Sequence, residues 1–119
     1  MNELKYIINK LIEPLCDVYF GKAKDSPDYP YAVFMLSSEA DFDKDDYILE
    51  VDVYDKRNTA FEIDELSEKI IKKLDRHKEY KENIQTCIYR IGMLDLSNLE
   101  TIRRRQLRFI CKTYKGEIV

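Results

Sequence analysis

The segment Tyr31–Ser37, with the sequence YAVFMLS, narrows the possible folds of this chain more than any other. Nearly every position in it is apolar, so a strand formed here is hydrophobic on both faces and has to be covered on both. The segment Tyr47–Tyr54 alternates instead, with apolar residues at every second position. Such alternation, rich in β-branched and aromatic residues, predicts a half-buried strand. We expect the acidic loop Glu39–Asp46 to join these two strands.

Two other segments have the apolar spacing of amphipathic helices. The first ends near Pro14, because a proline disfavours the helical conformation of the residue before it. The second begins with Thr59 and Glu62 at the spacing of a capping box, in which each side chain bonds the backbone of the other residue. The predicted buried stripes are Leu4, Ile7, Ile8, Leu11 and Ile12 in the first helix and Phe61, Ile63, Leu66, Ile70, Ile71 and Leu74 in the second.

The remaining segments alternate between loops and strands. Glycine, prolines and small polar residues predict a loop over Gly21–Pro30, and Asp75–Asn83 is polar enough to be a helix end and loop. Three strands are expected, with Gly92 marking a bulge in the second. They are Leu15–Phe20, Ile84–Leu94 and Ile102–Tyr114.

The order of elements is therefore helix, strand, strand, strand, helix, strand, strand. Hairpins predominate, so the sequence predicts an α+β fold in which two helices pack on one face of a mainly antiparallel sheet. With 119 residues, the chain is expected to form a single domain, residues 1–119.

Composition excludes several classes of function. Hydrophobic residues make up 45% of the chain, which excludes a disordered polar segment, and a net charge of −3 argues against general nucleic-acid or membrane-surface binding. No apolar run approaches the roughly 18 residues that span a bilayer, and no signal peptide is recognisable. Cys16, Cys87 and Cys111 form no CxxC pair, so we expect reduced thiols in a protein made in the cytosol.

The acidic loop invites a comparison with calcium-binding loops. Asp41, Asp43 and Asp45 stand at alternate positions, as in the first half of an EF-hand loop. The sixth position, however, is Asp46 instead of glycine, and the twelfth is Asp52 instead of a bidentate glutamate. We therefore interpret the segment as a solvated hairpin loop and expect no metal site.

We find no catalytic constellation, and the chain has too few glycines for the usual phosphate-binding or nucleophile motifs. His77 has no partner that would suggest catalysis or metal binding. Asp28 with Glu79 and Lys81 has the residue types of a metal-dependent nuclease, but we expect the latter two at a polar helix end. A divalent-cation enzyme using Glu50, Asp52 and Asp55 stays open as an alternative; no enzymatic activity and no cofactor are expected.

The Arg103–Arg105 run resembles a phosphate-binding patch, but adjacent strand residues point to opposite faces. At most Arg104 and Arg108 align with Lys112, so we expect interfacial or solvated arginines. With one face covered by helices, several apolar side chains of the other face remain exposed, and edge strands with such patches are common in oligomer interfaces. A second copy is expected to cover the face that carries Ile48, Tyr54 and Ile110.

Three stretches together resemble the tail-terminator, or tail-completion, proteins of long-tailed bacteriophages and prophages. They are PYAVFML, YILEVDVYDKRNTAFEIDELSEKIIKKL and IYRIGMLDLSNLETIRRRQLRFICKTY. The marks are Pro30-Tyr31 opening a strand, a strand that ends in Asp52-Val53-Tyr54-Asp55 and leads into the capped helix, and a final strand that starts with arginines. The resemblance covers nearly the whole chain and rests on the order of these patterns.

The resemblance implies a non-enzymatic virion protein that joins head to tail. Its subunits would form a homohexameric ring on the tail tube protein and face the head–tail connector protein, with DNA only as passing cargo and no membrane partner. Assembly would occur in the host bacterial cytoplasm, and the ring would then belong to the virion tail. The interface residues that we expect are Asp41, Asp43, Asp45, Ile48, Tyr54, Arg104, Arg108 and Ile110, with Glu39–Asp46 and Asp95–Thr101 as contact loops. Alternatives are another head–tail neck protein and a small α+β protein-binding or regulatory module.

Overall fold

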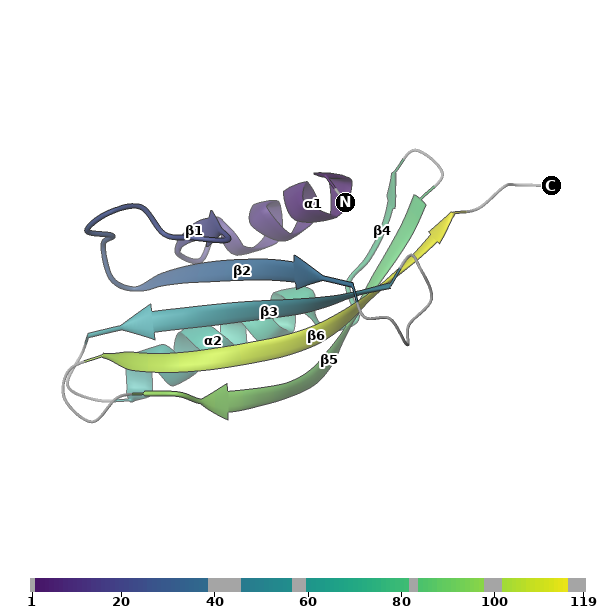
Figure 1. Cartoon of the computed structure of the whole chain (residues 1–119). Helices are drawn as coiled ribbons and strands as arrows, with labels where there is room; N and C mark the ends of the chain where they lie inside the picture. The colour runs from purple at the N-terminus through teal and green to yellow at the C-terminus, as the bar shows by residue number, and fades with distance from the viewer. Residues whose placement is uncertain (1, 39–45, 57–59, 82–83, 98–101, 116–119) are drawn as a thin grey trace.

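A computed structural model describes residues 2–38, 46–56, 60–81, 84–97 and 102–115 of the chain. It contains two helices and a six-stranded sheet in the order β1-β2-β3-β6-β5-β4 (Figure 1). Only β1 and β2 are parallel; all other neighbouring strands are antiparallel. The elements are α1 (Asn2–Ile12), β1 (Asp17–Phe20), β2 (Tyr31–Ser37), β3 (Asp46–Asp55), α2 (Phe61–Leu74), β4 (Lys78–Lys81), β5 (Ile84–Asp95) and β6 (Arg103–Lys115). The predicted α+β class is confirmed.

Both helices lie on the same side of the sheet (Figure 1). Their apolar stripes pack against the alternate strand residues that point toward them, because successive strand side chains face opposite sides. Phe61 is the exception: it was predicted in the buried stripe, but it is 70% exposed in the first turn of α2. The fully buried centre of this core includes Ile8 and Ile12 of α1, Ile63, Ile70 and Leu74 of α2, Phe34 of β2, Leu49, Val51 and Val53 of β3, and Leu107 and Phe109 of β6. The helices therefore cover one face of the sheet only.

The second helix begins later than the capping box predicts. The residue before its first turn is Ala60, which makes no side-chain capping bond, while Thr59 lies outside the described residues. At the other end, the N–H of Asp75 still donates to the carbonyl of Ile71, and Arg76 has a positive φ of 62°. This left-handed residue turns the chain directly into β4.

The strand β4 corrects the sequence-based prediction, in which Asp75–Asn83 was polar helix end and loop. Lys78–Lys81 pairs with Ile84–Cys87 at the start of β5. A short edge strand needs no apolar face of its own, so its polar sequence gave no strand signal. The bulge expected near Gly92 is confirmed by a register shift between Arg90 and Gly92.

The molecule is elongated, with extents of 55 × 28 × 25 Å. Figure 1 shows that β4, the start of β5 and the end of β6 extend the sheet beyond the end of α2.

Candidate functional site

The face of the sheet that carries no helix is the candidate functional site, and we call it the helix-free face. It begins at an aromatic end near β1 and continues through mixed polar and apolar rows toward β5. The strand registers place on it Tyr31, Val33, Met35 and Ser37 of β2, Ile48, Glu50, Asp52 and Tyr54 of β3, and Arg104, Gln106, Arg108, Ile110 and Lys112 of β6. No described element forms a layer over these residues.

Tyrosine rings cluster at one end of the helix-free face. The ring of Tyr31 stacks on Tyr54 at 4.9 Å between centroids, and Tyr29 and Tyr19 contact it at 5.2 and 6.0 Å. Burial, followed by the nearby tyrosines, raises the pKa of the Tyr31 phenol to about 12. Tyr31 is 8% exposed, because Tyr29 of the preceding loop and the rings of Tyr19 and Tyr54 surround it.

Arg104 joins this aromatic end to the charged middle of the face. Its guanidinium carbon lies 5.6 Å from the centroid of the Tyr54 ring. Its Nε donates to Asp52 Oδ1 at 3.3 Å, and its Nη2 lies 3.1 Å from Asp52 Oδ2. A two-point arginine–carboxylate contact fixes the orientation of both side chains. The predicted interfacial cation is therefore already paired within its own subunit.

Farther along the strands, the helix-free face carries an exposed methionine and an arginine whose hydrogen bonding is incomplete. Glu50 lies opposite Met35 on β2 and opposite Arg108 on β6. Met35 is 56% exposed, while the Nε of Arg108 is buried without a hydrogen-bond partner. Of the two predicted interfacial arginines, Arg104 is held by Asp52, whereas the buried Nε of Arg108 has no hydrogen-bond partner.

The sequence analysis predicted that Ile48 is exposed, and this prediction was wrong. Ile48 is 5% exposed and lies between Ser37 of β2 and Ile110 of β6, while Ile110 and Tyr54 are half-buried. A residue in a central strand has neighbours on both sides, and these shield it even where no helix covers the face. Residues 41–45, with the predicted contacts Asp41, Asp43 and Asp45, lie outside the described residues.

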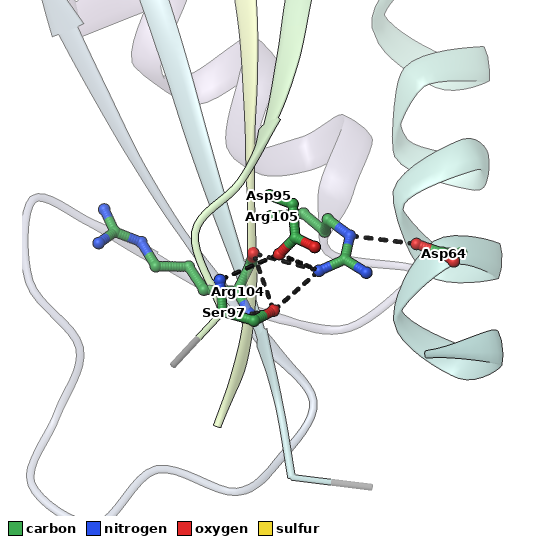
Figure 2. Close-up of polar contacts among 5 residues, drawn as sticks. All are labelled: Asp64, Asp95, Ser97, Arg104 and Arg105. Atoms are coloured by element: carbon green, nitrogen blue, oxygen red, sulfur yellow. Dashed lines mark hydrogen bonds and ion pairs between the residues drawn. The ribbon is translucent and has the colours of Figure 1, made fainter. Parts of the chain in front are cut away.

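A polar cluster on the opposite face was missed by the sequence analysis (Figure 2). Arg105 points toward the helices and is 6% exposed. Its Nε donates to Asp64 Oδ1 of α2 at 3.1 Å, and its Nη1 donates to Asp95 Oδ1 at 2.7 Å and Ser97 Oγ at 2.9 Å. The parity of β6 could have revealed it, because Arg105 shares the alternation of Leu107 and Phe109.

The cluster connects α2 with the ends of β5 and β6. Hydrogen bonds from Ser97 lower the pKa of the Asp95 carboxyl, and the charge of Arg105 lowers it further. The carboxylates of Asp64 and Asp95 remain more than half exposed while the arginine is buried. Such a geometry tethers a helix to a sheet.

The carboxylates that the sequence offered for metal chemistry do not converge. Glu50 and Asp52 lie on the helix-free face, whereas Asp55 lies on the helix side and is 1% exposed. Glu79 lies on β4 rather than at a helix end, at the sheet edge opposite β1 and β2, and therefore far from the loop of Asp28. Among the described residues, no group of three or more acidic, histidine or cysteine side chains could hold a metal ion.

The remaining features concern the cysteines, the helices and the comparison with known proteins. Cys16, Cys87 and Cys111 are free thiols, as expected, and burial raises the pKa of Cys111 to about 12. Neither helix is long and apolar enough to cross a membrane, within the ranges that the structure describes. No protein-family model matches the chain, and no curated protein matches it either.

Proposed function

We propose that this chain is a non-enzymatic structural subunit of a phage or prophage tail, which assembles with further copies into a ring at the end of the tail tube. The ring would stop tube growth and join the tube to the head connector. The observation that carries the proposal is the helix-free face: one whole side of the sheet has no covering layer in the described residues, yet it bears aromatic and apolar side chains.

An uncovered face of this composition favours contact with another protein. Met35 lies exposed on β2, just beyond the residues that pair with β1, and half-buried Tyr54 and Ile110 lie on β3 and β6. In general, large exposed apolar patches on proteins mark sites of interaction with another molecule. A ring requires head-to-tail contacts between unlike surfaces, which this face and a different surface of the neighbour would supply.

The charges on the helix-free face favour weak interaction with DNA that passes through a ring over tight DNA binding. Arg104 is neutralised by Asp52, and the whole chain carries a net charge of −3. Affinity for DNA comes largely from unpaired cations that displace counterions from phosphates. A ring of such subunits would let DNA pass without holding it.

The test combines light-scattering mass over a wide concentration range with negative-stain imaging, first alone and then with purified tail tubes. Closed rings, alone or at tube ends, support the proposal. A chain that forms no ring and does not cap tubes contradicts it. In that case, association of the monomer with another host or phage protein would favour the alternative of a protein-binding module.

A further inference from the structure

Exposed apolar side chains are concentrated at one edge of the sheet. Among the described residues, half of the large exposed apolar side chains lie between positions 89 and 96. They are Tyr89, Ile91, Met93, Leu94 and Leu96. This concentration lies on β5 and just beyond its end, away from the centre of the helix-free face.

The outer edge of β5 is hydrogen-bonded before the bulge and has no partner strand among the described residues after it. Before the bulge, β4 pairs with the strand, Ile88 exchanges hydrogen bonds with Arg76 and His77, and Asp75 Oδ1 accepts from the N–H of Arg90 at 2.9 Å. After the bulge, no described strand pairs with this side of β5. We call the segment Ile91–Leu96 the open edge; in Figure 1 no strand lies beside it.

The strand register shows which backbone groups are available there. The N–H of Leu96 donates to the carbonyl of Arg104 on β6. Because alternate residues of an antiparallel strand bond to the same neighbour, Leu94 also faces β6, whereas Met93 directs its N–H and carbonyl toward the open edge. Unpaired backbone groups beside apolar side chains form a template for a further strand.

The charges around the open edge identify the strand that fits it. An exposed arginine, Arg90, lies at one end of the open edge. At the other end lies Asp95, whose Oδ1 accepts from Arg105 and Ser97 but whose side chain is still 62% exposed; both residues lie on the helix side of the sheet. A second copy that runs antiparallel reverses this order, so that Arg90 of each copy lies near Asp95 of the other. The edge is therefore complementary to itself, as a two-fold contact requires.

We propose that the open edge pairs with the same edge of a second copy, antiparallel and about a two-fold axis at Met93. Met93 then lies opposite its own equivalent, and the two residues exchange a pair of backbone hydrogen bonds. The contact is separate from the head-to-tail contacts of a ring and does not depend on the proposed function. It joins two six-stranded sheets into one.

A single cysteine tests this geometry, because only a two-fold contact brings a residue against itself. In a hydrogen-bonded antiparallel pair the Cα atoms lie about 5.5 Å apart, within the range of a disulfide. We expect oxidised Met93→Cys to form a covalent dimer, and Met35→Cys, which is the more exposed of the two positions and lies on the helix-free face, to remain largely uncrosslinked. The unsubstituted protein, oxidised in parallel, controls for Cys16, Cys87 and Cys111.

A second pair of variants tests the backbone bonds. Met93→Pro removes an N–H that points out of the sheet, so it should retain the fold and abolish the dimer, while Met93→Thr keeps the N–H and should retain a weaker dimer. Circular dichroism and thermal unfolding check the fold of each variant.

Three results would overturn the open-edge contact: a native chain that is monomeric at every concentration, a Met93→Cys variant that crosslinks no better than Met35→Cys, or a folded Met93→Pro variant that dimerises like the native chain. Ring formation or tube capping in the same samples would leave the proposed function standing.

Discussion

Arg105 places a permanent charge inside the fold, and its removal should be costly. Its buried stem packs under α2, and its guanidinium holds Asp64, Asp95 and Ser97 together. We expect Arg105→Ala to lower the free energy of unfolding by about 2–4 kcal/mol, since both packing and several charged hydrogen bonds are lost. Asp64→Asn should cost less than about 1 kcal/mol, because that carboxylate is largely exposed.

Urea denaturation of the variants measures these effects, with Lys72→Ala on the exposed side of α2 as the control for a lost surface charge. Equal losses for Arg105→Ala and Lys72→Ala would contradict a structural role for the Arg105 cluster.

Tyr31 should make the protein sensitive to alkali. Its pKa in the folded state is about 12, against an ordinary value of 10.0, because burial disfavours the phenolate. The stability that Tyr31 contributes is complete below pH 10 and is lost as the pH rises toward 12, since the unfolded chain ionises first. Between pH 9 and 11, Tyr31→Phe should lose roughly 1 kcal/mol less stability than the native protein.

Denaturant titrations at the two pH values provide the measurement, and Tyr80→Phe on the exposed face of β4 is the matched control. If Tyr31→Phe loses stability with pH as steeply as the native chain does, Tyr31 is not the residue responsible.

Helices and strands with a strong apolar periodicity could be predicted from the sequence, whereas short polar elements could not. The range Tyr31–Ser37 was predicted to the residue, because a continuous apolar run with a preceding proline leaves few alternatives. Lys78–Lys81 was missed, since its strand conformation comes from pairing with β5 rather than from its own sequence. Burial of Ile48 likewise depends on neighbours that only the three-dimensional arrangement supplies, whereas burial of Arg105 follows the alternation of Leu107 and Phe109 and was overlooked.

The carboxylate of Asp75 links the end of α2 to β5. Asp75 follows the helix, and its side chain accepts the N–H of Arg90 beside the open edge. Asp75→Ala should therefore lower stability by about 0.5–1.5 kcal/mol, the net value of one hydrogen bond. Asp75→Asn keeps an acceptor oxygen and should lose less. Thermal unfolding compares the two, and equal losses would show that the Arg90 contact contributes nothing.

For the whole molecule, divalent cations separate a structural subunit from a metal-dependent enzyme. A ligand that binds only the folded state at 100 times its Kd stabilises it by about 2.7 kcal/mol. Because Asp55 lies on the opposite face from Glu50 and Asp52, we expect millimolar Ca²⁺ or Mg²⁺ to leave the Tm unchanged relative to a chelator. A rise of several degrees would favour the enzyme, or a calcium site in the acidic loop.

The arrangement of layers predicts which substitution should separate assembly from folding. Met35 is exposed on the helix-free face and lies opposite Glu50, so a glutamate there should lower the stability of the subunit by only about 0.2–1 kcal/mol, the cost of a like-charge pair across two strands. In a ring whose subunits bury this face, the added carboxylate would lose its water against apolar side chains. Every subunit of the ring would bear this cost. Met35→Glu should therefore abolish rings at concentrations where the native chain forms them. Phe61→Glu, which adds the same charge at an exposed position of α2, should still assemble. Light scattering with negative-stain imaging reports both variants, and rings formed by Met35→Glu as readily as by the native chain would move the ring contact away from this face.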